Sequence, residues 1–330
     1  MAKRGLLIGI NYRNTSDELN GCINDVNNVR EFLASKLGYT SFIVLTDDTT
    51  IKPTRANILG AIDTFVRSLK AGDEGWFHFS GHGILQRDFN RDEESGFDSC
   101  IVPIDYDVSG LITDDVIRRM LVQRVPKGAK LYVVLDACNS GTGCDCRYKY
   151  DDDSSYSIDQ NAKTLPKTYQ PSEWSLRQTV RELKKYTKTS GEVFCISGCQ
   201  DEQTSADAFI QQDQQYGGAL TSTLLAHMQS NDLNTYKWKH LLKDVCCNLK
   251  IDGYTQQATI TSGQPINMEN TVFEIKKKLK IHKKIMYVNR HINNHTNHGN
   301  MNMMKSIGAN TMKHVVDMKR VGTNMMKLKL

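Results

Sequence analysis

The stretch that most constrains the fold is an apolar run, residues 131–135 (LYVVL), followed directly by Asp136, Ala137 and Cys138. A continuous apolar run that ends in polar residues predicts a strand buried on both faces of a parallel sheet. Such a strand places Cys138 at its carboxyl end, the edge where open α/β sheets carry their chemistry. Taken alone, Cys138 is more often a buried structural thiol than a nucleophile.

Strand-like and helix-like segments alternate along most of the chain. Apolar runs predict strands at 6–10, 42–45, 76–79, 100–104, 131–135, 193–197, 254–260 and 272–275. Helical spacing of apolar residues predicts helices at 20–37, 54–69, 114–122, 217–228 and 235–249, and a polar helix is expected at 173–188. This alternation predicts an α/β fold with a mostly parallel central sheet and helices on both faces.

Composition changes twice along the chain. Residues 146–172 are rich in Asp, Ser and Lys and contain two prolines, which predicts a flexible linker. Residues 276–330 hold 13 Lys or Arg and one acid, whereas the rest of the chain has a net charge of about −7. We expect a disordered basic tail, and a solvated tail is favoured over one that binds nucleic acid or an anionic surface.

The cysteines and the apolar runs indicate in which cellular compartment the protein is expected. The sequence has nine cysteines, and we expect no amino-terminal signal peptide. No apolar run approaches the roughly 20 residues that a transmembrane helix needs. We therefore expect free thiols in a reducing, cytoplasmic compartment and no transmembrane segment.

A second reactive loop lies 56 residues before Cys138, where the strand at 76–79 runs into Ser80-Gly81-His82-Gly83. If the two strands are neighbours, His82 faces Cys138 and can act as the base that a thiol needs near neutral pH. The flanking glycines leave room for a peptide and free N–H groups for an oxyanion. His78 is a competing histidine, but its place inside an apolar strand predicts burial.

Two acids can give this site a preference for basic substrates. Asp136 lies two residues before Cys138, and Asp25 lies at the start of a predicted helix that follows a strand. Two carboxylates in one pocket attract a guanidinium or ammonium group and repel an acidic one. The alternative role of Asp25 is to stabilise the amino terminus of its helix.

These loops resemble those of the metacaspases, relatives of the caspases, whose histidine lies about 50 residues upstream of the cysteine. The resemblance rests on the Ser-Gly-His-Gly and Asp-Ala-Cys-x-Ser-Gly motifs. Further blocks agree in order, namely 19–26 (LNGCINDV), 96–98 (GFD), 101–106 (IVPIDY), 196–207 (ISGCQDEQTSAD) and 218–221 (GALT). The resemblance covers roughly residues 5–275 and implies a caspase-like three-layer sandwich.

The resemblance implies a cysteine endopeptidase that cuts protein or peptide substrates after Arg or Lys. His82 would be the base, Cys138 the nucleophile, and the N–H groups of Gly83 and Cys138 the oxyanion hole. By the same resemblance, Cys22 and Ser80 would line the pocket with Asp25 and Asp136. The family's members also imply a monomer.

A second acidic set matches positions that bind an activating Ca²⁺ in type I metacaspases. It consists of Asp98, Asp114, Asp115 and Asp145. Carboxylate oxygens are the ligands that Ca²⁺ prefers. Without the resemblance, Asp114 and Asp115 are simply acids in the first turn of a helix.

The resemblance also implies a domain plan. We expect a large-subunit-like part at 1–145, a linker with self-processing sites at 146–190, a small-subunit-like part at 191–275 and the basic tail at 276–330. This plan favours a type I member without a prodomain, and Arg147, Lys149, Lys163 and Lys167 are the candidate processing sites.

One departure and two alternatives stay open. Asn139 stands where the family usually has histidine after its nucleophile, and we expect it to affect loop packing more than the His82–Cys138 dyad. A legumain- or gingipain-like peptidase would share the His-Gly and Ala-Cys pairs but differ in specificity. A catalytically silent scaffold is the alternative from another class of protein.

Overall fold

A computed structural model describes residues 1–89, 96–138, 143–152, 178–183, 186–198, 207–210, 215–254 and 258–274. All of them belong to one compact unit, residues 1–275. The basic tail at 276–330, most of the predicted linker and Asn139 lie outside the described residues.

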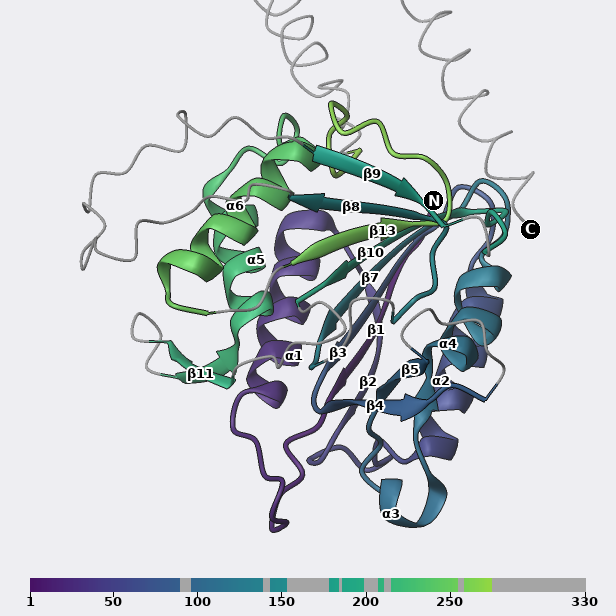
Figure 1. The fold of residues 1–330 in the computed structure, drawn as a ribbon, viewed down its shortest axis with the longest axis vertical. Helices are drawn as coiled ribbons and strands as arrows, with labels where there is room; N and C mark the ends of the chain where they lie inside the picture. The colour runs from purple at the N-terminus through teal and green to yellow at the C-terminus, as the bar shows by residue number, and fades with distance from the viewer. Residues whose placement is uncertain are drawn as a thin grey trace, which may run out of the picture. The chain divides into compact units, whose positions relative to one another are not determined.

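An eight-stranded sheet forms the centre, in the order β2-β1-β3-β7-β10-β13-β8-β9 (Figure 1). The pairs from β2 to β10 are parallel, and the last three pairs are antiparallel. The strands are β1 (Lys3–Gly9), β2 (Ser41–Thr46), β3 (Glu74–Ser80), β7 (Lys130–Asp136), β8 (Tyr148–Asp152), β9 (Gln178–Glu182), β10 (Glu192–Ser197) and β13 (Thr259–Ser262). The mostly parallel sheet that the sequence predicts is thus confirmed.

Helices cover both faces of this sheet (Figure 1). One face packs against α1 (Cys22–Phe32), α5 (Ala219–Ser230) and α6 (Trp238–Ile251), and the other against α2 (Arg55–Ser68) and α4 (Asp114–Met120). Neighbouring strand residues alternate between the two cores, as Val133 and Val134 do in β7. Because residues 131–135 are at most 1% exposed, the central strand predicted from their apolar run is confirmed.

Threonine side chains cap the amino termini of α2 and α4, the helices on the second face. The Thr54 hydroxyl accepts from the Asn57 N–H at the start of α2, and the Thr113 hydroxyl accepts from the Val116 N–H at the start of α4. Each bond satisfies one of the backbone donors that a helix leaves open at its amino terminus.

Shorter elements complete the fold. A π-helical turn, η1 (Leu33–Leu37), follows α1, and a 3₁₀ turn, η2 (Val122–Arg124), follows α4. Small antiparallel sheets contain β4 (Gly83–Arg87), β5 (Phe97–Ile101) and β6 (Ile112–Thr113), and β11 (Asp207–Ile210) with β12 (Gln215–Gly218). The short helix α3 (Tyr106–Ser109) connects β5 to β6.

Four predicted segments differ from the structure. The flexible linker expected at 146–172 is wrong at 148–152, which form β8 between β13 and β9. The polar helix expected at 173–188 is wrong in its described part, where β9 pairs with β8 at the end of the sheet. Edge strands tolerate polar sequences, so residue pattern alone does not reveal them. The strand expected at 272–275 is also wrong, because Val272 and Phe273 enter the core without forming a strand. The strand expected at 100–104 belongs instead to the small β4-β5-β6 sheet.

His78 lies in β3 with 0% exposure, as its apolar neighbours predict. Neither of its ring nitrogens has a hydrogen-bond partner among the described residues. Burial lowers the pKa of His78 to about 3, because the charged imidazolium loses its hydration there.

We predict that His78 makes the fold acid-sensitive. An unfolded histidine gains its proton below about pH 6.5, whereas folded His78 stays neutral, so stability falls as pH drops from 6.5 toward 3. Between pH 7 and pH 5 the unfolding free energy should fall by about 2 kcal/mol more in the wild type than in His78→Leu. Urea unfolding at both pH values measures this, with the exposed His240→Leu as control. Equal pH dependence in wild type and His78→Leu would contradict the assignment.

Candidate active site

The two predicted reactive loops meet at one edge of the sheet. β3 and β7 are parallel neighbours, with Ser80 opposite Asp136, so His82 and Cys138 each lie two residues beyond a paired strand end. Gly83 contacts the second loop so closely that a Cβ there would lie 2.0 Å from the Cys138 carbonyl oxygen. The structure therefore brings the loop that carries His82 and Gly83 against the backbone of Cys138.

His82 is held by a loop that the sequence did not single out. Its Nε2 lies 2.7 Å from the backbone carbonyl oxygen of Asp17. A carbonyl oxygen only accepts hydrogen bonds, so Nε2 carries the proton and neutral His82 keeps Nδ1 as its basic atom. The hydroxyl of Tyr106 in turn donates to Asp17 Oδ2 over 2.7 Å and ties this loop to α3.

Cys138 differs from the other described cysteines. It is partly exposed, whereas the remaining described thiols are buried. Burial raises the pKa of Cys100 to about 12, with the charges of Asp114 and Asp98 adding to the effect. Burial also raises the pKa values of Cys144 and Cys146. Since the thiolate is the reactive form, these buried thiols are poor nucleophiles and Cys138 is the accessible one.

Asp25 and Asp136 are two buried carboxylates whose hydrogen-bond donors include backbone N–H groups around the start of α5. Asp25 Oδ2 accepts from the Ser80 hydroxyl at 2.6 Å, and the Gly218 N–H lies 3.1 and 3.0 Å from the two Asp25 oxygens. Asp136 Oδ2 accepts from the Thr221 N–H at 2.7 Å, in the first turn of α5, where the helix dipole favours a negative charge. The two carboxylates thus meet around the start of α5.

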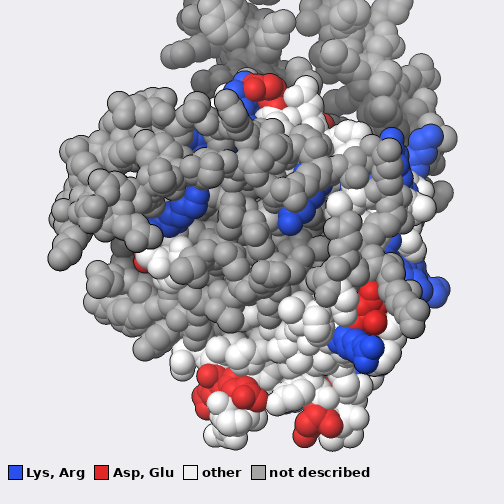
Figure 2. Space-filling view, viewed as in Figure 1, with Lys and Arg blue, Asp and Glu red and all other residues white. Residues whose placement is uncertain are grey.

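Gly218 fits between these carboxylates because it has no side chain. A Cβ at this position would lie 2.1 Å from Asp136 Oδ2. Cys22, the remaining predicted pocket residue, is buried in the first turn of α1, close to Asp25. Exposed acidic side chains are seen at the lower end of the face in Figure 2. Asp25 and Asp136 do not belong to this surface charge, because they are only 1% and 4% exposed.

The four acids of the predicted calcium set are only partly gathered. Asp98 and Asp114 are buried, and both act on the Cys100 thiol. Asp114 Oδ2 accepts from the Ser99 N–H at 2.9 Å, and Asp114 Oδ1 accepts from the Asp115 N–H at 3.0 Å. Among the described residues, no group of three or more His, Cys, Asp or Glu could hold a metal ion.

Asp145, the fourth acid, is held by protein groups. It has a left-handed backbone with φ 46°, and its Oδ1 accepts from the Tyr186 hydroxyl at 2.6 Å. Its backbone carbonyl accepts a hydrogen bond from Arg118, whose guanidinium lies 4.9 Å from the Tyr186 ring centre. Arg118 lies one turn after Asp114 in α4, and both residues are buried.

Comparison with known proteins identifies the family. Residues 3–147 match the metacaspase, peptidase C14 domain. Metacaspase-1 of Meyerozyma guilliermondii is 32% identical over 294 residues, which cover 81% of this chain and 70% of that protein. Metacaspase-1B of Aspergillus fumigatus is 34% identical over 294 residues, which cover 81% and 71%.

The chain belongs to the metacaspase family.

Metacaspase-2 of Arabidopsis thaliana is 36% identical over 241 residues, which cover 71% of this chain and 54% of that protein. The matched region thus spans between about half and seven-tenths of these relatives' lengths. The family consists of caspase-like cysteine peptidases, so membership confirms the enzyme class predicted from the two motifs.

Solved structures confirm the fold expected of a metacaspase. Caspase-1 from Spodoptera frugiperda superposes with a TM-score of 0.50 at 12% identity, covering 84% of this chain and 91% of that one. A protein from Geobacter sulfurreducens gives a TM-score of 0.55 at 20% identity, covering 83% and 100%. The caspase-like α/β sandwich is therefore confirmed. No helix in the described part of this metacaspase is both long and apolar enough to cross a bilayer.

Proposed function

We propose that this metacaspase is a cysteine endopeptidase that cuts peptide bonds after Arg or Lys through Cys138 and His82. The observation that carries the proposal is the buried pair Asp25 and Asp136, which lies at the same sheet edge as the two reactive loops. Buried carboxylates are costly unless they are hydrogen-bonded or paired with a cation. A substrate guanidinium or ammonium group would be that cation.

In the proposed mechanism, Cys138 Sγ attacks the scissile carbonyl carbon while His82 Nδ1 takes the thiol proton. The hydrogen bond from Nε2 to the Asp17 carbonyl stabilises the imidazolium that forms. The N–H groups of Gly83 and Cys138 would stabilise the tetrahedral oxyanion.

The intermediate then collapses and the C–N bond breaks, with His82 giving its proton to the leaving amine. A thioester links the substrate acyl group to Cys138. A water molecule next loses a proton to His82 and attacks this thioester. The acid product leaves, and the proton returns to the Cys138 sulfur, so the enzyme is regenerated.

The specificity proposal predicts that Asp25→Asn selectively lowers the peptidase activity on substrates with Arg or Lys before the scissile bond. Removing one charge from a buried ion pair typically costs about 2–5 kcal/mol, so kcat/KM for Arg and Lys peptides should fall by about 30-fold or more. Fluorogenic peptides ending in Arg, Lys, Asn or Asp measure this, and Asp63→Asn, at an exposed acid paired with Arg67 and Arg124, is the control.

The same peptide panel separates the alternatives. The rate at which iodoacetamide modifies Cys138 should be unchanged in Asp25→Asn, because the nucleophile is intact. A wild type that prefers Asn or Asp would point to a legumain-like specificity and contradict the acidic pocket. A wild type that cleaves none of these peptides, with or without Ca²⁺, would favour the scaffold.

We further propose that Ca²⁺ activates the enzyme through Asp98, Asp114, Asp115 and Asp145. The donor chemistry fits, since Ca²⁺ takes six to eight oxygen ligands. Asp98, Asp114 and Asp145 are all buried, and the Asp145 carbonyl accepts from Arg118 of α4, the helix that begins at Asp114. A bound ion would supply positive charge to these carboxylates and connect β5, α4 and the segment after Cys138.

Calcium should therefore raise both the melting temperature and the peptidase rate of the wild type, but not those of Asp98→Ala or Asp145→Ala. Thermal unfolding and peptide hydrolysis, each with Ca²⁺ and with Mg²⁺, measure the two effects. Asp107→Ala, near the exposed end of α3, is the control acid. Calcium without effect on either quantity in the wild type would exclude this activation.

Self-processing is a further part of the proposal, with Arg147, Lys149, Lys163 and Lys167 as the candidate cleavage sites. A peptidase binds an extended segment whose backbone is free, but Lys149 lies within β8 between two paired strands. The Arg147 carbonyl accepts from the Leu183 N–H at 2.7 Å. The other two candidates, Lys163 and Lys167, lie outside the described residues.

A further inference from the structure

Tyr12 lies against His82, although the two residues are far apart in the sequence. Its ring centre is 4.7 Å from that of the imidazole, with the planes tilted by 39°. The Tyr12 hydroxyl accepts from the His82 N–H at 3.0 Å and donates to the Val102 carbonyl at 2.7 Å. The Val102 N–H donates back to the His82 carbonyl at 3.1 Å. These three bonds close a ring that fixes the His82 backbone on both sides.

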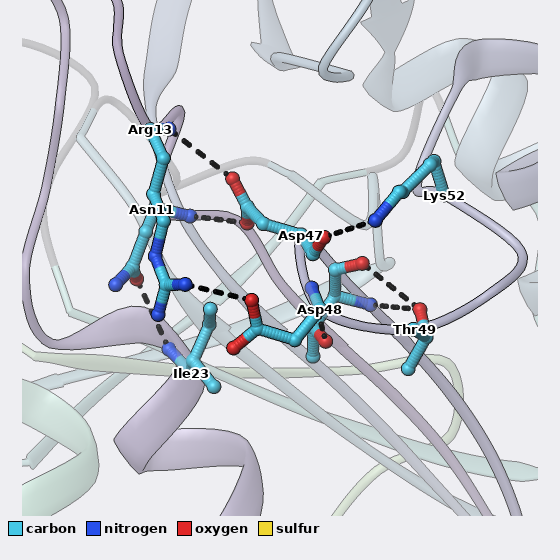
Figure 3. Close-up of polar contacts among 8 residues, drawn as sticks. Asn11, Arg13, Ile23, Asp47, Asp48, Thr49 and Lys52 are labelled. Carbon is cyan, nitrogen blue, oxygen red and sulfur yellow. Dashed lines mark hydrogen bonds and ion pairs between the residues drawn. The ribbon is translucent and has the colours of Figure 1, made fainter.

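The backbone of Tyr12 is held in an unusual conformation. Its φ is 51°, in the left-handed region that bulky residues rarely adopt. Asp47, just after β2, accepts from the N–H groups on either side of Tyr12, from Asn11 at 2.7 Å and from Arg13 at 3.3 Å (Figure 3). Two backbone N–H groups that converge on one carboxylate stabilise such a turn.

Neighbouring groups hold this turn and Asp47 in place. The Asn11 side-chain oxygen accepts from the Ile23 N–H at 3.1 Å, which ties the turn to α1. The Lys52 ammonium group donates to the Asp47 carbonyl, and Arg13 pairs with Asp48 at 2.7 Å (Figure 3). The turn thus presents the Tyr12 ring to His82 from a braced loop.

We propose that Tyr12 is a positioning residue for His82, and that Asp47 holds Tyr12 in place for this role. The inference rests on the proposed His82–Cys138 chemistry and deepens it. The hydroxyl fixes the His82 backbone, and the aromatic face limits rotation of the imidazole, so that Nε2 stays on the Asp17 carbonyl and Nδ1 stays available. An aromatic face also favours the imidazolium cation that forms during the reaction.

Tyr12→Phe and Tyr12→Leu separate the two contributions. Tyr12→Phe keeps the aromatic face and loses the hydroxyl, and we expect kcat to fall about tenfold with KM unchanged, since a displaced catalytic group slows the chemical step. Tyr12→Leu also loses the face, and we expect a fall of about 100-fold. Asp47→Asn should also lower kcat, by less than Tyr12→Phe does.

Tyr39→Phe is the matched control. Tyr39 is also a buried tyrosine, and its hydroxyl donates to Glu74 at 3.0 Å, so its removal costs a comparable buried hydrogen bond. We expect Tyr39→Phe to lower the melting temperature but to leave kcat unchanged. An equal loss of kcat in Tyr39→Phe would mean that Tyr12 acts only through stability and would overturn the proposal.

A spectroscopic measurement tests the positioning without any substrate. In a Cys138→Ala background, the ¹⁵N chemical shifts of the His82 ring report which nitrogen carries the proton. The proposal expects the Nε2–H form with Tyr12 present and a mixture of both forms in Tyr12→Leu. Unchanged shifts in Tyr12→Leu would overturn it. A wild type without peptidase activity would instead contradict the proposed function, and the shifts would still decide the role of Tyr12.

Discussion

The parallel pairing of β3 with β7 is the constraint on which the rest of the site depends. It sets Ser80 opposite Asp136, so the loops that follow these two strands begin side by side at the same edge of the sheet. Because the strands of a parallel sheet end at the same edge, the pairing alone brings an imidazole and a thiol from distant parts of the sequence to one place. Close contact between Gly83 and the Cys138 backbone then sets how near the two loops lie.

The buried carboxylates of Asp25 and Asp136 lie at the same edge, and part of their hydrogen bonding comes from late in the chain. Gly218 and Thr221, around the start of α5, donate backbone N–H groups to Asp25 and Asp136. These donors offset part of the cost of burying two carboxylates, and a cationic substrate side chain would offset more. These bonds join α1, the ends of β3 and β7 and the start of α5, so the two carboxylates are held together only when all of these elements are folded.

The sequence predicted those elements that have a periodic apolar pattern and those loops that carry a reactive side chain. The buried β7 run, the strand and helix alternation, the burial of His78 and the two reactive motifs were all visible as patterns. Strands β8 and β9 were missed because tertiary pairing, and not their own polar residues, makes them strands. The Asp17 carbonyl could not be predicted, since every residue carries one. Tyr12 was missed because its role depends on a left-handed turn held by Asp47, which no local spacing reveals.

The most direct test of the central claim is to trap the nucleophile covalently. A peptidyl-arginine chloromethyl ketone presents a basic side chain and an electrophilic carbon, and a thiolate displaces its chloride to form a thioether. Mass spectrometry of the digested protein should find one adduct, on Cys138, that is absent in His82→Ala and slow to form with a peptidyl-aspartate analogue. An adduct on another cysteine, or equal labelling by the aspartate analogue, would contradict the assignment of Cys138 and its acidic pocket.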